Sequence, residues 1–264
     1  MAGTSQVVGD ISIEVGDDFV ALVEIHRPPS NFFDADLINS ISDAYEQLDR
    51  DPACRAIVLC AEGKHFCAGA NFGNPSERTP GAADAPARDL YTEAARIIEA
   101  QTPVVAAVHG AAIGGGMGLA CSADFRVGCS ETRMAANFAQ LGFHHGFGLT
   151  VTLPPIVGQQ RALELLLTGK RIDGEEAHRI GLLDRFVAAE EVRAEARRFA
   201  AEIASSAPLA VASIRSTMRA GLGERYRAAT AREGKEQAWL RATEDFREGI
   251  KATAERRPPQ FQGR

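Results

Sequence analysis

The sequence predicts an α/β fold, and three observations carry this prediction. Two short apolar runs, 56–60 and 104–108, are of the type found in strands buried on both faces. Each run is followed by a loop rich in small residues and then by a helical pattern. From Gln159 onward the sequence becomes mostly helical. We therefore expect strand–loop–helix units followed by a helical region.

The first quarter of the chain predicts a β-hairpin and a capped helix. Residues 7–27 alternate apolar and polar side chains around a turn at 16–18, which indicates two antiparallel strands. Asp34 then precedes a helical apolar pattern and can cap it. The apolar positions of that helix are Leu37, Ile38, Ile41, Tyr45 and Leu48.

The remaining elements follow from periodicity and from glycine and proline. A loop is expected at 74–86, which holds three prolines. A helix over Leu90–Ile98 ends before Pro103, and a third short strand is expected at 124–127. The apolar face Val192, Ala196, Phe199 and Ile203 indicates a later helix. We expect a core domain at 1–200 and a helical region at 201–264.

Composition and charge exclude several classes of protein. The 264 residues are 45% hydrophobic and 24% charged, so the chain is not wholly disordered. The formal net charge is −6, whereas a general nucleic-acid binder would carry a basic surplus. Residues 1–6 do not have the pattern of a secretory signal, and no segment has the apolar length of a membrane span.

Five cysteines without a Cys-x-x-Cys pair argue against a disulfide framework and against a structural zinc site. Reduced thiols in the cytoplasm are the simplest expectation. Cys67 lies in the loop at 63–71, a candidate functional loop, where we interpret it as a small spacer residue and not as a nucleophile.

Two glycine-containing loops, 63–71 and 109–118, are the strongest candidates for a functional site. Both follow a buried strand, which is where ligands bind in open α/β sheets. Three consecutive glycines, 114–116, at a helix start leave free N–H groups that suit a developing negative charge. The alternative is that these glycines only permit close packing. A dinucleotide fingerprint is not completed, because Leu119 takes the place of its last glycine, and Arg171 breaks a phosphate-loop pattern.

Together the two loops resemble motifs of the crotonase superfamily, the enoyl-CoA hydratase/isomerase family. The matching stretches are Phe-Cys-Ala-Gly-Ala at 66–70 and Ala-Ala-Val-His-Gly-Ala-Ala-Ile-Gly-Gly-Gly at 106–116, and the likeness continues through 166–172, 177–183 and 248–250. The resemblance implies a spiral of ββα turns with a helical C-terminal region used in trimerisation. It also implies a homotrimer or dimer of trimers.

The same resemblance implies an acyl-CoA thioester as substrate, with coenzyme A as part of the substrate and no further cofactor. The thioester oxygen would lie between the backbone N–H groups of Ala68 and Gly115. Fixed donors of this kind stabilise an enolate or oxyanion more than the ground state. No metal is expected, because no ligand cluster is evident in the sequence.

The sequence departs from the family at both catalytic glutamates. Gly118 and Phe138 stand where family hydratases carry these two residues. We hypothesise that His144 or His145, with His145 favoured, is a general acid/base instead. The alternative is that both histidines only shape the pocket. Glu93 is a weaker candidate on the preceding helix.

Binding of coenzyme A is expected to involve Lys64, His65 and Ala70 of the first loop, with Arg256 near the C-terminus. The family places an aromatic residue three positions before this basic one, and Thr253 replaces it here. Tail solubility is the alternative explanation for Arg256.

The sequence therefore predicts an acyl-CoA-processing enzyme related to enoyl-CoA hydratase/isomerase. An isomerase, hydrolase or decarboxylase acting on an acyl-CoA is one alternative. A non-catalytic acyl-CoA-binding protein is a second, since both glutamates are replaced. A nucleotide-dependent oxidoreductase is a third, and the incomplete glycine fingerprint disfavours it.

Overall fold

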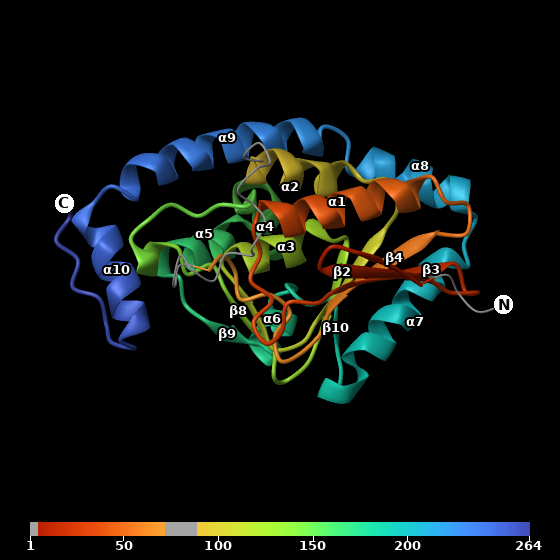
Figure 1. The fold of residues 1–264 in the computed structure, drawn as a ribbon, viewed down its shortest axis with the longest axis horizontal. Coiled ribbons are helices and arrows are strands. Elements are labelled where there is room, and N and C mark those ends of the chain that lie inside the picture. Colours follow the sequence, from red (N-terminus) through yellow and green to blue (C-terminus); the bar gives the residue numbers. More distant parts are fainter. Residues whose placement is uncertain (1–4, 72–88) are drawn as a thin grey trace.

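A computed structural model describes residues 5–71 and 89–264 (Figure 1). The predicted loop at 74–86 lies outside these residues. The described chain forms a seven-stranded sheet in the order β1-β2-β3-β4-β5-β7-β10 and a three-stranded sheet in the order β6-β8-β9. The strands of the larger sheet are β1 (Ser5–Val8), β2 (Ile11–Val15), β3 (Val20–Ile25), β4 (Ala56–Ala61), β5 (Val104–Val108), β7 (Phe125–Gly128) and β10 (Arg185–Phe186). Those of the smaller sheet are β6 (Ala111–Ile113), β8 (Arg133–Ala135) and β9 (Ile172–Asp173).

The larger sheet is antiparallel at its N-terminal edge and parallel elsewhere. Strands β2 and β3 form the predicted hairpin, with Ile13 opposite Val23. The hairpin is extended by β1, because Gly9, at φ +57°, lets the chain reverse before β2. From β3 through β4, β5 and β7 to β10 the pairing is parallel.

Ten α-helices lie in the described part of the chain. They are α1 (Ala35–Asp49), α2 (Leu90–Glu99), α3 (Gly115–Ser122), α4 (Leu149–Val157), α5 (Gln159–Thr168), α6 (Gly174–Arg179), α7 (Val192–Ala204), α8 (Pro208–Met218), α9 (Leu222–Leu240) and α10 (Glu244–Ala254). Two short 3-10 turns, η2 (Ala139–Leu141) and η3 (Ala189–Glu191), complete the elements. Asp34 caps α1 as predicted, since its side chain accepts a hydrogen bond from the Leu37 N–H.

Two apolar cores sit on opposite faces of the larger sheet, and all residues of β4 and β5 are buried. One core packs the sheet against α1, α2 and α3, and the other packs it against α7. Helix α9 runs across α2 at the top of the molecule, and α10 follows at the C-terminal end (Figure 1). The domain boundary expected at residue 200 falls inside α7.

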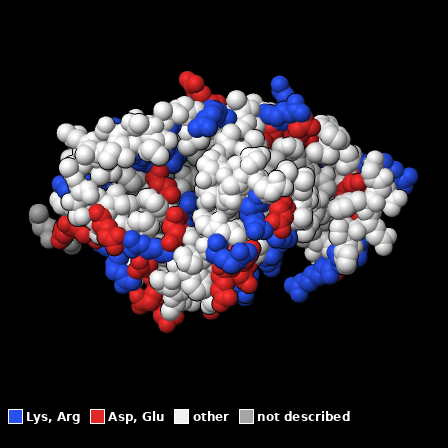
Figure 2. All heavy atoms as spheres, turned by 180° about the vertical axis from the view of Figure 1, so that it is seen from behind, with Lys and Arg blue, Asp and Glu red and all other residues white. Residues whose placement is uncertain are grey.

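Asp124, which directly precedes β7, anchors the helical region to the sheet. Its carboxylate accepts from the Val104 N–H at 2.8 Å and pairs with Arg215 and Arg219, each at 2.9 Å. Elsewhere acidic and basic side chains alternate on the face shown in Figure 2 and do not separate into single-sign patches. Within residues 5–71 and 89–264, no helix has the length and apolar character required to cross a membrane.

Candidate active site

The two glycine-containing loops lie side by side, where β4 and β5 end. The Cys67 N–H donates to the Ala111 carbonyl at 2.9 Å, and the Ile113 N–H donates to the Cys67 carbonyl at 3.0 Å. The first loop thus pairs with β6 through a single parallel bridge, Cys67 with Ala112, and this pairing brings Ala70 and Gly115 to one region of the molecule.

Two glycines are required for this close approach. A Cβ on Gly116 would lie 2.1 Å from the Cys67 carbonyl oxygen, so the packing explanation holds for this residue. A Cβ on Gly69 would lie 2.7 Å from the Ile113 oxygen and 3.9 Å from the Gly115 nitrogen. The second distance shows that the backbone of the first loop reaches the start of α3.

The backbone amide of Ala68 is already engaged. Its N–H donates to the Ser30 carbonyl at 2.9 Å, so the expectation that it faces a ligand oxygen is not supported. Among the described residues, the N–H groups of Ala70 and Gly115 have no protein acceptor. Gly115 is the first residue of α3, where helix geometry leaves amides unpaired.

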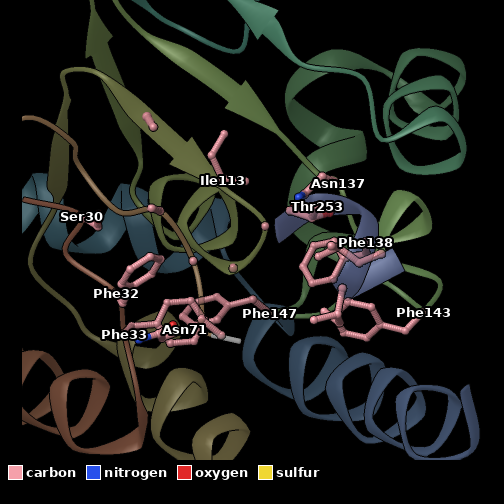
Figure 3. Close-up of a pocket in the computed structure, with 18 of the residues that line it drawn as sticks. Ser30, Phe32, Phe33, Asn71, Ile113, Asn137, Phe138, Phe143, Phe147 and Thr253 are labelled. Carbon is pink, nitrogen blue, oxygen red and sulfur yellow. The ribbon is translucent and has the colours of Figure 1, made fainter. Parts of the chain in front are cut away.

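Both free amides belong to residues that line a cavity of about 550 Å³. Its wall is largely aromatic and aliphatic, and no aspartate or glutamate lines it among the described residues. Figure 3 shows the rings of Phe32, Phe33 and Phe147 on one side and those of Phe138 and Phe143 on the other. Polar groups come from Ser30, His65, Asn71, Tyr91, Asn137, Arg171, Gln237, Arg241 and Thr253.

Positions 118 and 138 have different surroundings. Phe138 lines the cavity, and its ring meets Phe143 edge-on at 5.4 Å between centroids. Gly118 is buried in α3, and a Cβ there would lie 2.6 Å from the Phe147 Cβ. Phe147 has φ +58°, an uncommon conformation for a bulky residue, and packs against Phe33 at 5.3 Å. Phenylalanines thus occupy the space around both positions.

His145 is held in a hydrogen-bonded chain with Thr150 and Glu233, neither of which is among the described residues that line the cavity. The Thr150 hydroxyl donates to Glu233 Oε1 at 2.6 Å, so it accepts from His145 Nε2 at 2.8 Å. Burial, and then the neighbouring His144, lower the pKa of His145 to about 4. The imidazole is therefore neutral at pH 7, with its proton on Nε2.

The acid/base hypothesis for the two histidines finds no support in this geometry. The His144 ring stacks on His145 at 4.1 Å, and its Nδ1 hydrogen-bonds the His145 carbonyl oxygen at 2.8 Å. Neither histidine is among the described residues that line the cavity. The weaker candidate, Glu93, pairs with Arg96 at 2.7 Å and does not line the cavity either. The alternative, that both histidines only shape the pocket, has no lining contact in its favour either, because the contacts of their rings are to each other and to Thr150.

Sequence reasoning missed a polar cluster on α2 and α9. The Gln237 Nε2 donates to the His144 carbonyl at 3.1 Å, which fixes the amide and directs its oxygen toward Tyr91. The Tyr91 hydroxyl donates to that oxygen at 3.0 Å, and Arg241 donates to it at 3.3 Å. Burial, followed by Glu233, raises the pKa of Tyr91 to about 12, so the phenol stays protonated. No motif marked these residues, because they meet only in the folded chain.

The residues expected to contact coenzyme A divide into two groups. His65 and Ala70 line the cavity, whereas Lys64 and Arg256 are not among the described residues that do. The His65 Nδ1 accepts from the Ala111 N–H at 3.2 Å, so its neutral ring carries the proton on Nε2. Burial, and then the Lys64 charge, lower the pKa of His65. Arg171, which the sequence did not predict as a coenzyme A contact, also lines the cavity.

Cys67 is buried, and burial raises the pKa of its thiol to about 12. A protonated thiol is a poor nucleophile, which fits the spacer interpretation. In the described part of the chain, no group of three His, Cys, Asp or Glu side chains is arranged to hold a metal ion.

Comparisons with known proteins agree with this architecture. A family model described as enoyl-CoA hydratase/isomerase matches residues 16–264. A probable enoyl-CoA hydratase of Bacillus subtilis is 33% identical over 258 residues, covering 96% of this chain and 98% of the relative. A crotonyl-CoA hydratase of Syntrophomonas wolfei is 34% identical over 254 residues, covering 93% of this chain and 95% of the relative.

Solved structures give the same result. An enoyl-CoA hydratase/isomerase from Pseudoalteromonas atlantica superposes with a TM-score of 0.84 at 29% identity, covering 96% of this chain and 100% of that one. An enoyl-CoA hydratase from Mycobacterium avium subsp. paratuberculosis superposes with a TM-score of 0.81 at 27% identity, covering 97% and 100%.

Proposed function

Because the chain belongs to the enoyl-CoA hydratase/isomerase family and has the crotonase fold, we propose that its cavity binds an acyl-CoA thioester. We infer that the N–H groups of Ala70 and Gly115 hold the thioester oxygen, with Ala70 in the role that the sequence suggested for Ala68. The observation that carries the proposal is that these two amides belong to residues that line one cavity, on paired loops, and have no acceptor among the described residues.

The chemistry follows from the charge that develops on the thioester oxygen. When a bond changes at the α-carbon or the carbonyl, the oxygen becomes an enolate or a tetrahedral oxyanion. Two fixed N–H donors, one at the positive end of the α3 dipole, stabilise that charge more than the neutral ester. Losing one such donor typically raises the barrier by roughly 2.7–4 kcal/mol.

A two-carboxylate hydration has no support in the described part of the cavity, which presents no Asp or Glu side chain. With Gly118 and Phe138 at the glutamate positions, we propose enolate or oxyanion chemistry that uses no carboxylate pair. Isomerisation, thioester hydrolysis and decarboxylation of an acyl-CoA remain the candidate reactions. Decarboxylation forms the enolate without a base, because carbon dioxide leaves with its bond electrons remaining on the substrate.

A non-catalytic acyl-CoA-binding role is the second candidate. The absence of carboxylates among the described lining residues favours it, whereas the unpaired amides of Ala70 and Gly115 favour catalysis. Calorimetry with a panel of acyl-CoA esters, followed by product analysis for each ester, separates the two. Binding with turnover of one ester supports the enzyme, and binding without any turnover supports the carrier. Binding of no ester, or equal binding of free coenzyme A, would refute both.

The coenzyme A portion is expected to lie near His65 and Arg171, which line the cavity. Arg171 supplies a positive charge for phosphate there, despite the acidic net charge of the chain. Arg256 lies outside the described lining of the cavity, so a role for it in binding coenzyme A has no support in this geometry. That role remains a prediction.

We also propose that copies of the chain associate, as the family resemblance implies. Helix α8 has no buried residue, and Leu209, Ile214 and Met218 are 86%, 64% and 80% exposed. Apolar side chains gathered on one helix are typical of an interface. Light scattering should give the mass of a trimer or hexamer, and an M218E variant should have a lower mass.

We also propose a cytoplasmic location, which the five unpaired, buried cysteines fit.

A further inference from the structure

We propose that the acyl group accepted by this cavity is planar and aromatic, such as an arylpropenoyl group, in preference to a linear alkyl chain. The inference rests on the proposed function, namely that the cavity binds an acyl-CoA thioester. It is carried by four phenylalanine side chains that line the cavity around the start of α3: Phe33, Phe138, Phe143 and Phe147.

Two of these rings flank the point where the thioester would be held. The Phe33 Cζ lies 2.3 Å from the position that a Cβ on Gly115 would take. The Phe138 Cζ lies 3.8 Å from the corresponding position on Gly114. In Figure 3 the two rings stand on opposite sides of the cavity. An acyl group leaving the Gly115 amide therefore has aromatic surface on both sides within its first few carbon atoms.

A second ring supports each of the two. Phe147 meets Phe33 at 5.3 Å with an interplanar angle of 62°, and Phe143 meets Phe138 at 5.4 Å and 63°. Phe143 is in turn backed by Phe246 of α10 at 5.2 Å. The four lining rings are between 2% and 7% exposed, so they form fixed walls.

Fixed aromatic walls discriminate by shape and by electrostatics. A flat ring presents its face or its edge to both walls and loses little conformational freedom when it binds, whereas an alkyl chain of equal size must order several torsions. Aromatic pairs contribute favourable free energy beyond the area they bury, and two new contacts of this kind correspond to a preference of roughly tenfold.

The test compares two esters of equal carbon number. Isothermal titration calorimetry of trans-cinnamoyl-CoA and trans-2-nonenoyl-CoA keeps the thioester, the double bond and the nine carbons constant. We expect cinnamoyl-CoA to bind about tenfold more tightly. Equal affinity, or tighter binding of nonenoyl-CoA, would overturn the inference.

Variants locate the source of the preference. F138L should reduce the ratio of the two affinities to about twofold or less, and F143L should lower it in the same direction. F125L is the matched control, because Phe125 packs on Phe199 at 4.6 Å in the core on the α7 side of the sheet. The control should leave the ratio unchanged. If both cavity variants keep the wild-type ratio while folded by circular dichroism, the aromatic walls do not select the acyl group.

Butyryl-CoA separates failure of this inference from failure of the proposed function. Its short acyl group reaches the amides of Ala70 and Gly115 without requiring the aromatic walls. Binding of butyryl-CoA with no preference for cinnamoyl-CoA leaves the function standing and contradicts the inference. Absence of binding for all three esters contradicts both.

Discussion

Phe147 fills the space that a side chain at position 118 would need: a Cβ on Gly118 would lie 2.6 Å from the Cβ of Phe147. The Phe147 Cβ is tied directly to its backbone, and the φ of that backbone is +58°. Phe147 also packs against Phe33 and is only 2% exposed, so it has little room to withdraw. The loop that carries Phe147 and the helix that carries Gly118 are thus adapted to each other.

A G118E substitution should therefore destabilise the protein without creating hydratase activity. Overpacking of a buried position costs roughly 1–3 kcal/mol, and burial of an unpaired carboxylate adds to that cost. Thermal unfolding measures the loss of stability, and an assay of crotonyl-CoA hydration measures whether hydratase activity appears.

The matched control is G234A in α9. A Cβ there meets Tyr91 Cε2 at 3.7 Å, which is ordinary contact, and alanine is favoured over glycine in a helix by about 0.5–1 kcal/mol. Its melting temperature should stay the same or rise. Efficient hydration by G118E at an unchanged melting temperature would contradict the account of the two positions.

Glu233 should stabilise the loop that carries Phe147. Its buried carboxylate accepts from the Gly148 N–H at 2.9 Å, the Thr150 N–H at 3.1 Å and the Thr150 hydroxyl at 2.6 Å. E233Q replaces one of the two acceptor oxygens by an NH₂ group and leaves either the Gly148 N–H or the Thr150 donors without an acceptor. We therefore expect a loss of about 1–3 kcal/mol in the free energy of unfolding and weaker acyl-CoA binding.

A second glutamate on α9 provides the comparison for E233Q. Glu236 contacts Arg232 and Trp239 at the surface, and E236Q should cost at most about 0.5 kcal/mol. Chemical denaturation of the two variants gives the comparison directly. Equal stabilities would show that the buried carboxylate does not hold the loop.

His145 gives the protein a defined acid sensitivity. Its pKa is about 4 in the folded chain, below the ordinary value of 6.5, so the unfolded chain takes up a proton first as the pH falls. Stability from this group is fully present above pH 6.5 and is lost between pH 6.5 and about pH 4. At pH 4 the loss in the free energy of unfolding should be about 3 kcal/mol.

H145Q removes this titration and should flatten the stability profile over the same pH range. Glutamine retains an N–H donor for Thr150, whose hydroxyl accepts from His145 in the wild type. Denaturation midpoints measured in steps from pH 7 to pH 4 provide the readout. Parallel wild-type and H145Q profiles would mean that His145 is not buried in its neutral form.

Local sequence patterns predicted the fold more completely than the site. Alternation, the Asp34 cap and the buried runs each depend on neighbouring residues, and the hairpin, α1, β4 and β5 follow from them. The glycine loops were found for the same reason, because their motifs are contiguous. The role expected for the Ala68 N–H could not be checked from the motif alone, because its acceptor, the Ser30 carbonyl, belongs to a separate segment of the chain.

The polar cluster of Tyr91, Gln237 and Arg241 could not be predicted because its members are up to 150 positions apart in the sequence. His144 and His145 are titratable residues in a candidate loop, and that pattern alone suggests an acid/base role. Their roles depend on Thr150, Glu233 and Gln237, which the structure brings together from α4 and α9. Side-chain chemistry alone did not reveal the direction in which each ring points.

The most direct test of the central claim removes single backbone N–H groups. Replacing Ala70 by lactic acid turns its amide into an ester, and the same change at Ala68 is the matched control. Each ester also makes the carbonyl of the preceding residue a weaker hydrogen-bond acceptor. At position 70 this is the Gly69 carbonyl, which accepts from the Phe33 N–H at 3.0 Å, and at position 68 it is the Cys67 carbonyl, which accepts from the Ile113 N–H at 3.0 Å. The two changes therefore differ chiefly in which N–H is lost.

The readout is the ¹³C chemical shift of the thioester carbonyl in bound [1-¹³C]butyryl-CoA, which moves downfield when the oxygen accepts strong hydrogen bonds. Wild type and the position-68 ester should both show the downfield shift, and the position-70 ester should return most of the way to the value of free butyryl-CoA. A full shift retained at position 70, or lost at position 68 alone, would contradict the account.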